Sequence, residues 1–144
     1  MRRLAVALFS LCLALPAMAA DAARPERKEV FGDVTVHYNA FSSSMLQPQI
    51  ATNVGVQRSK NQGVLNIAVL KAGKPAMAVV SGTVKDLTGR SSPLSFRQVN
   101  DGGAVGYIAQ FKIEQPETLV FDLNVETGGV SHKLSFSQEV FPGQ

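Results

Sequence analysis

The chain has 144 residues, with 14 Lys and Arg against 11 Asp and Glu, which gives a formal net charge of +3 at pH 7. Two of the basic residues, Arg2 and Arg3, belong to a leader that we expect to be removed, so the remaining balance is 14 − 2 − 11 = +1. Nucleic-acid binding leaves a concentrated basic surface, and the remaining Lys and Arg are scattered, so we exclude nucleic acid as a partner.

Residues 1–19 have the order of a secretory signal peptide. Met1-Arg2-Arg3 is positively charged, residues 4–15 are nearly all apolar, and Ala17-Met18-Ala19 supplies small residues for cleavage. The apolar run is shorter than the roughly 20 residues that a membrane-spanning helix needs. We therefore expect cleavage after Ala19, export to the periplasm and no membrane span afterwards. The one cysteine, Cys12, leaves with the leader, which excludes disulfides and thiolate metal sites in the processed chain.

The processed chain begins with a polar segment and continues as a single domain. Residues 20–29 are polar and contain Pro25, which predicts a flexible lead-in. A β-sandwich domain is expected over residues 30–142. Its first strand carries Val34, Val36 and Tyr38 on one face, and Thr35, His37 and Asn39 on the other. Residues 48–54 are the one helical candidate, since proline suits the first helical turn and Gly55 the position after the end.

Strand patterns follow one another through the rest of the chain. Residues 63–71 are apolar on both faces, as expected of a central strand. The next strand is expected over residues 77–87, and its Gly82 indicates either a bulge or a close backbone contact. Residues 93–99 form a short strand with proline at its start or on an edge. Further strands are expected at 105–113, 119–125 and 134–140.

These patterns predict an all-β fold with about seven strands and one short helix between the first and second strands. Turn signals every eight to twelve residues are typical of an antiparallel sandwich of two sheets. The processed chain has neither Cys nor Trp, so other aromatic residues must fill the core. The expected set is Phe31, Phe41, Phe96, Tyr107, Phe111, Phe121 and Phe136.

Catalytic and metal-binding patterns are weak. The two histidines, His37 and His132, lie on separate strands, and no G-x-S-x-G turn is present. A hydrolase that uses either histidine with a nearby hydroxyl stays open as an alternative. A copper-handling protein is a second alternative, because Met45 and Met77 could join the histidines as soft ligands. We expect no cofactor and favour a protein that is not an enzyme.

Two polar stretches are the best candidates for a binding surface. His37, Tyr38 and Asn39 lead into a serine-rich loop, and a second polar loop precedes the central strand. If the short helix folds back over the sheet edge, the two stretches become neighbours and offer an imidazole, amides, hydroxyls and cations to an anionic or peptide ligand. The candidate residues in the second loop are Arg58, Ser59, Lys60 and Asn61. An ordinary solvated surface is the alternative interpretation.

The same stretches resemble a family of small exported proteobacterial proteins known as domain of unknown function 4426. The resemblance runs from about Val30 to Phe141 and is most specific at GDVTVHYNAF (32–41), Leu46-Gln47-Pro48, Arg58-Ser59-Lys60-Asn61 and Asn66-Ile67. It implies an immunoglobulin-like sandwich in the periplasm and brings no activity, cofactor or catalytic residue. We therefore expect a non-catalytic periplasmic binding or accessory module, whose partner is an envelope protein or a small ligand and whose oligomeric state the sequence leaves open.

Overall fold

The structure is a computed structural model that describes residues 27–143. The expected signal peptide (1–19) and most of the expected lead-in lie outside the described residues. Among the residues that are described, no helix is long and apolar enough to cross a membrane.

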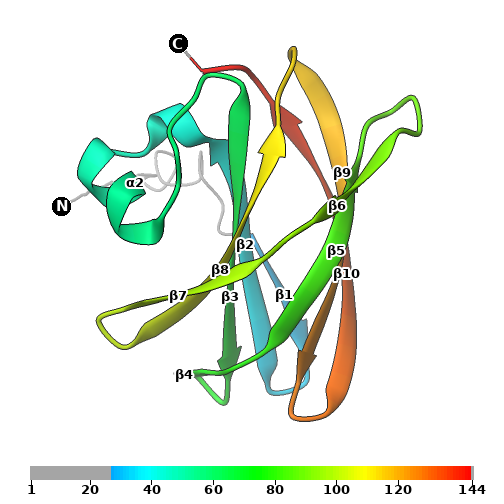
Figure 1. Cartoon of the computed structure of the whole chain (residues 1–144). Helices are drawn as coiled ribbons and strands as arrows, with labels where there is room; N and C mark the ends of the chain where they lie inside the picture. Colours follow the sequence, from blue (N-terminus) through cyan, green and yellow to red (C-terminus); the bar gives the residue numbers. More distant parts are fainter. Residues whose placement is uncertain (1–26, 144) are drawn as a thin grey trace, which may run out of the picture.

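Ten strands and two short helical segments make up the described chain (Figure 1). The bounds are β1 Lys28–Phe31, β2 Val34–Ser42, the 3-10 helix η1 Ser43–Met45, α2 Pro48–Val54, β3 Gln62–Lys71, β4 Lys74–Pro75, β5 Val79–Lys85, β6 Ser91–Leu94, β7 Arg97–Asp101, β8 Ala104–Lys112, β9 Glu117–Thr127 and β10 Val130–Val140.

The strands form two antiparallel sheets that face each other. The first sheet has the order β1-β2-β3-β8-β7, with β4 also paired to β3, and the second has the order β10-β9-β5-β6. In Figure 1 the two layers stand side by side, and α2 lies against the outer face of the first sheet. The predicted all-β sandwich with one short helix is confirmed, and so are the bounds of that helix, Pro48–Val54.

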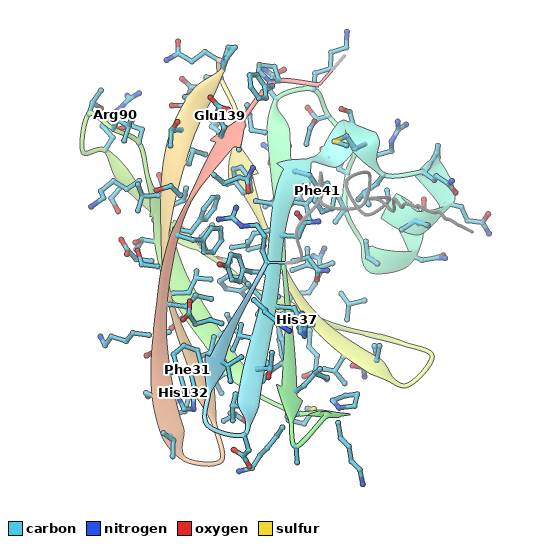
Figure 2. The ribbon with its side chains drawn as sticks, turned by 180° about the vertical axis from the view of Figure 1, so that it is seen from behind. Phe31, His37, Phe41, Arg90, His132 and Glu139 are labelled. Atoms are coloured by element: carbon cyan, nitrogen blue, oxygen red, sulfur yellow. The ribbon has the colours of Figure 1, made fainter. Side chains whose placement is uncertain are left out.

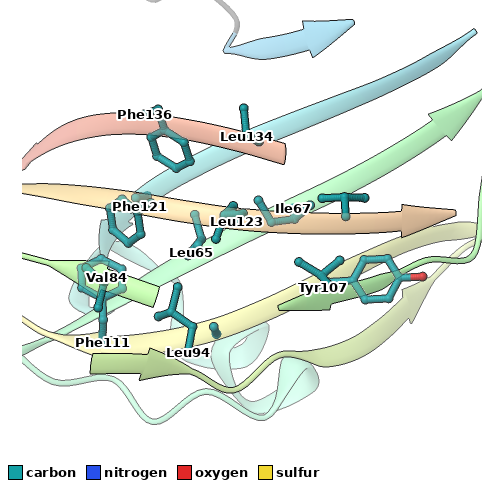
Figure 3. Packing of buried hydrophobic residues seen from close by; sticks show 14 of the residues in the cluster. Leu65, Ile67, Val84, Leu94, Tyr107, Phe111, Phe121, Leu123, Leu134 and Phe136 are labelled. Atoms are coloured by element: carbon teal, nitrogen blue, oxygen red, sulfur yellow. The ribbon is translucent and has the colours of Figure 1, made fainter. Parts of the chain in front are cut away.

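The main core lies between the sheets because the inward residues of each strand alternate with outward ones. Figure 3 shows Phe121, Phe136 and Phe111 meeting there. The ring centroid of Phe121 lies 5.1 Å from that of Phe111 and 5.0 Å from that of Phe136. Tyr107 is also buried, and its hydroxyl accepts a hydrogen bond from the Ala78 N–H at 2.7 Å. This bond ties the segment that precedes β5 to the opposite sheet.

Not every aromatic residue expected in this core is fully part of it. Phe31 and Phe96 are only partly buried against it. Phe41 points the other way and packs in a second apolar cluster with Ala51, Val56 and residues of the first sheet's outer face. The expected place of Phe41 in the main core is therefore wrong, because period two along β2 turns its side chain to the face opposite Tyr38, which α2 covers.

The strand count exceeds the expected seven by three, for three local reasons. β1 begins in the last two residues of the expected lead-in, because Lys28–Phe31 pairs with β2. β4 is a two-residue strand in the turn after β3. The single strand expected over residues 93–99 is two strands, β6 and β7, which belong to different sheets. The chain crosses between the layers at Ser95-Phe96, and Pro93 lies on the edge strand β6, where its missing N–H is tolerated.

α2 is fixed to the sheet beneath it at its C-terminal end. Gly55 ends the helix with φ 74°, a left-handed conformation that favours glycine. The Arg97 guanidinium on β7 donates to the carbonyls of Val54 at 3.1 Å and Gly55 at 2.6 Å. A cation at this end also complements the helix dipole. The connection from β2 to β3 is therefore held over the outer face of the first sheet.

Candidate functional site

The two polar stretches singled out in the sequence meet at the end of β2. Arg58 donates to the Ser44 carbonyl at 3.0 Å. Ser43 and Ser59 exchange two hydrogen bonds, with the Ser59 N–H donating to Ser43 Oγ at 2.9 Å and that hydroxyl donating to the Ser59 carbonyl at 3.0 Å. The serine-rich loop and the second polar loop are thus neighbours, and these contacts fix one loop to the other.

The remaining loop residues also have backbone partners. The Asn61 carbonyl accepts the Ile113 N–H at 2.9 Å, which continues the pairing of β3 with β8. The Lys60 carbonyl accepts the Gly143 N–H at 2.8 Å, which ties the C-terminal tail to the loop. The loop therefore closes one end of the sandwich and joins three segments that are distant in sequence.

The three strand residues of the candidate surface do not share a face. His37 and Asn39 lie on the outer face of the first sheet, opposite Ala68 and Asn66 on β3. Tyr38 points inward and stacks on Phe136 with centroids 4.2 Å apart. His37 is five residues before Ser42, and a strand rises about 3.3 Å per residue, so roughly 16 Å separates it from the loop. Only Asn39 of the three lies at the hollow described next.

Arg27 lies directly before β1 and closes the gap between β2 and the edge strand β10 at the height of Tyr38. Its guanidinium lies 5.1 Å from the ring centroids of both Tyr38 and Phe136. It also donates to the Ser137 carbonyl at 3.1 Å and to the Gln138 side chain. Figure 2 shows β1 filling the space beside the lower half of β2, with Phe31 against His132. Above Arg27, no described strand covers the edge of β2.

A groove opens directly above Arg27, between the upper half of β2 and the C-terminal end of β10. We name it the edge groove. Its volume is about 800 Å³, and its floor includes the buried side chains of Ala40 and Val140. Figure 2 places Phe41 and Glu139 on the two strands that border it. The lining residues are Asn39, Ala40, Phe41, Ser42, Ser44, Met45, Gln138, Glu139, Val140, Phe141, Pro142 and Gly143.

The backbone of β2 is unpaired along this groove. The Tyr38 N–H donates to the Arg27 carbonyl at 3.1 Å, so even-numbered residues of β2 turn their N–H and C=O groups towards the β1 side. The Asp33 carbonyl accepts from Ala72 at the end of β3, which confirms that odd-numbered residues face β3. β1 pairs with β2 only as far as His37. Within residues 27–143, Ala40 and Ser42 therefore turn their backbone groups to a sheet edge that no strand covers.

Two large apolar side chains on the rim of the edge groove are exposed. Met45 is 68% exposed and Phe141 is 56% exposed. The sequence suggested Met45 only as a possible copper ligand, and it did not point to Phe141, Gln138 or Glu139 as part of a binding surface. After β10 the chain continues as Phe141-Pro142-Gly143. This apolar tail after the last strand is the one sequence feature that could have pointed to the groove. Nothing in the sequence placed this tail beside Asn39, because the two stretches are about 100 residues apart.

A second hollow of about 720 Å³ lies at the other open edge, between β6 and the corner from β8 to β9. Asp86 borders it and organises the turn after β5. Its carboxylate accepts hydrogen bonds from the Thr88 hydroxyl at 2.6 Å and from the N–H groups of Thr88 at 3.0 Å and Arg90 at 2.9 Å. These bonds, the Thr88 hydroxyl first among them, lower the pKa of Asp86 to about 2.

The pKa of Asp86 gives a test of this turn. We expect an NMR titration of its carboxyl carbon to give a pKa of about 2, and Thr88→Val to raise that pKa towards the ordinary aspartate value. Because the folded-state pKa is depressed, the turn's contribution to stability is complete above the unfolded pKa and is lost as pH falls towards 2. A Thr88→Val protein with an unchanged Asp86 pKa would contradict this assignment. Ser92→Ala is a matched control that alters another hydroxyl of the hollow.

The two histidines lie on different sheets of the sandwich, His37 on β2 and His132 on β10. In the part of the chain that the structure describes, no group of three or more His, Cys, Asp or Glu residues is placed to hold a metal ion. The ring of His132 packs on Phe31 with centroids 4.8 Å apart, so it is half-buried rather than the solvated rim residue that a strand start suggests. His37 lies on the outer face of the other sheet.

Comparison with solved structures supports the fold. The crystal structure of a DUF4426 family protein from Pseudomonas aeruginosa PAO1, at 2.09 Å resolution, is 50% identical, has a TM-score of 0.76, and covers 83% of this chain and 97% of its own. A copper-bound variant of FetP from uropathogenic Escherichia coli strain F11 is 12% identical, with a TM-score of 0.61 and coverage of 83% and 96%. FetP as isolated after expression in the periplasm is 11% identical, with a TM-score of 0.62 and coverage of 83% and 95%.

The two FetP structures show a shared fold alone, because their identity to this chain is so low. No curated protein matches the chain. The sequence profile described as "Domain of unknown function (DUF4426)" matches residues 28–143, which is most of the chain and nearly all of the described part. The chain is therefore a member of the DUF4426 family, as the resemblance in its first strand and its polar loops implied.

Proposed function

We propose that this protein is a non-catalytic binding module of the bacterial periplasm and that the edge groove is its binding site. The observation that carries the proposal is the combination of an unpaired backbone edge at Ala40 and Ser42 with exposed apolar side chains, Met45 and Phe141, on one groove of about 800 Å³. Soluble proteins usually cover or charge such an edge, because it pairs readily with other chains. An uncovered edge with an apolar rim is typical of a binding surface.

The alternatives have less support in the described residues. A hydrolase needs a base within hydrogen-bond reach of a nucleophile. The ring of His132 packs on the Phe31 ring, which places an apolar neighbour against this imidazole. FetP has been solved with copper bound, but that property belongs to FetP, and its 12% identity extends only the fold to this chain. Binding without catalysis is the function that the groove supports.

The periplasmic location is supported by residues 1–19, which have the charge, apolar run and small residues of a cleavable leader. We expect the protein to be recovered in the periplasmic fraction of its host with Ala20 as its first residue. Amino-terminal sequencing of that fraction checks both points. A chain that retains Met1 in the membrane fraction would contradict them.

Site-specific photo-crosslinking in living cells tests the edge groove directly. A photoreactive phenylalanine analogue at Met45 is expected to give a discrete adduct with one envelope component. The same analogue at Val79 is the matched control, because Val79 is 66% exposed but lies on the outer face of the second sheet. The adduct should disappear when Glu139→Lys is added, since that change reverses the charge of the groove. Equal adducts at Met45 and Val79, or an adduct that Glu139→Lys leaves intact, would contradict the proposal.

A further inference from the structure

We propose that the occupant of the edge groove is an extended peptide segment of another protein, which adds an antiparallel strand to β2 beside Ala40 and Ser42. This inference rests on the proposed function and names the class of its ligand. Addition of a strand to an open sheet edge obtains affinity from main-chain hydrogen bonds and specificity from alternate side chains. Both requirements can be read from the described residues of the groove.

The backbone groups that such a strand needs are in place. The register of β1 and β2 pairs Lys28 with His37, and the bond between the Tyr38 N–H and the Arg27 carbonyl extends it by one residue. The next residues on β2 that turn their N–H and C=O groups to this side are Ala40 and Ser42. An added strand would therefore continue the sheet directly above the end of β1 with up to four main-chain hydrogen bonds.

The chain's own lead-in is poorly suited to fill this edge. Continuing the register of β1 would place Pro25 opposite Ala40, at a position whose N–H must donate to the Ala40 carbonyl. Proline has no N–H, and proline is excluded from paired positions of a sheet for that reason. Continuation of β1 in this register would lose a main-chain hydrogen bond at Ala40, which a strand without proline from another chain can form.

The groove also specifies side chains. A residue opposite Ala40 turns its side chain to the same face as Ala40, which is the floor that Ala40 and Val140 form. Ala40 is small, so a branched aliphatic side chain such as valine fits there. Glu139 is the only charged residue among those that line the groove. The favoured ligand therefore alternates aliphatic and polar residues and carries a basic residue.

A synthetic peptide tests this inference. The probe is the hexapeptide acetyl-KSVSVK-amide, titrated into the ¹⁵N-labelled processed chain. The valines should face the floor, so their N–H groups should point to β2. We expect the largest amide shifts at Ala40 and Ser42. N-methylation of both valines should weaken binding at least tenfold, because two main-chain hydrogen bonds of about 1 kcal/mol each are lost. N-methylation of both serines is the matched control, because their N–H groups point away from β2. We expect it to change the affinity less than threefold.

Variants of the protein separate strand addition from simple adhesion. Ala40→Pro removes the Ala40 N–H, which points to the open edge, and leaves the hydrogen bonds between β2 and β3 in place. We expect this variant to bind the peptide about tenfold more weakly with an unchanged circular dichroism spectrum. Should Ala40→Pro unfold the chain, the N-methylated peptides still decide the question on the unaltered protein. Glu139→Lys should weaken binding at least threefold, whereas Glu126→Lys, an exposed residue on β9, should not.

Several results would overturn the inference. Equal affinity for the two N-methylated peptides excludes strand addition, while a groove-specific adduct at Met45 would still support the proposed function. Contacts between residues 23–26 and Ala40 in the free protein would make the lead-in the occupant. Dimerisation on concentration, with shifts at Ala40 and Ser42, would make a second copy the occupant. No peptide binding at millimolar concentration would also overturn it.

Discussion

Replacing Phe121 with alanine is expected to lower the free energy of unfolding by about 3–5 kcal/mol, the usual cost of deleting a buried phenyl ring. Phe121 has 0% exposure and packs between the rings of Phe111 and Phe136. Phe136 lies on β10, which pairs with β9, and Phe111 lies on β8 of the opposite sheet. Because strands of both layers hold these rings in place, the cavity cannot easily collapse. The midpoint of thermal unfolding should fall by roughly 10 °C or more in a domain of this size.

Leu87→Ala is the matched control for this experiment. Leu87 is 75% exposed, so its truncation should change stability by less than about 0.5 kcal/mol. Urea unfolding and thermal unfolding, both followed by circular dichroism, measure the free energy of unfolding and the melting temperature of both variants under the same conditions. A loss of only one or two degrees for Phe121→Ala would show that Phe121 does not form the centre of the core.

Replacing Gly82 with alanine is expected to destabilise the protein by about 3 kcal/mol, because the added methyl group overpacks a site that cannot yield. A Cβ at Gly82 would lie 2.9 Å from the Cα of Leu123 and closer still to the carbonyl oxygen of Asp122. Both are backbone atoms of β9, the strand that pairs with β5 through Gly82. Relief would require the two strands to separate.

Gly106→Ala tests whether this cost comes from the close backbone approach or from losing any strand glycine. The nearest atom to a Cβ at Gly106 would be the side-chain oxygen of Asn66, at 3.3 Å, and the backbone oxygens of Ile67 and Val99 would lie at ordinary contact distances of 3.7 and 3.9 Å. The Asn66 side chain can move, and alanine also restricts the unfolded chain, so the change should be near neutral. Thermal unfolding of the two variants side by side gives the comparison. Equal destabilisation would contradict the backbone explanation for Gly82.

The fold could be predicted because its determinants are local. Alternation of apolar and polar residues placed the buried faces of β2, β8, β9 and β10. The central strand β3 was predicted because it is apolar on both faces, and the helix was placed by Pro48 and Gly55. The interpretation of Gly82 as a close backbone contact is confirmed by its approach to β9. The split of β6 and β7 could not be predicted, since Ser95-Phe96 carries no turn signal that marks a change of sheet.

The candidate site was predicted less well because its residues meet only in the folded chain. The serine-rich loop and the Arg58 loop were expected to be neighbours if the helix folds back, and hydrogen bonds through Ser43 and Ser59 join them. Asn39 lies on the edge groove, but Tyr38 belongs to the stack with Arg27 and Phe136. The groove itself depends on where β1 stops and where the C-terminal tail runs, and neither follows from local pattern.

The edge groove also explains why Arg27 is placed where it is. Its guanidinium covers the Tyr38 and Phe136 rings and bonds the edge of β10 at Ser137. Below this point β1 completes the sheet, and above it the sheet edge is open. Arg27 therefore separates the closed part of the sandwich from the part proposed to bind.

Residue-resolved amide hydrogen exchange on the free protein tests the open edge most directly. An unpaired edge predicts an alternating pattern along the upper half of β2. The Asn39 and Phe41 amides, which face β3, should be strongly protected, and the Ala40 and Ser42 amides should exchange at least a hundredfold faster, about 2.7 kcal/mol in protection. Uniform protection of all four amides would show that this edge is already covered, and neither the groove nor strand addition would then stand.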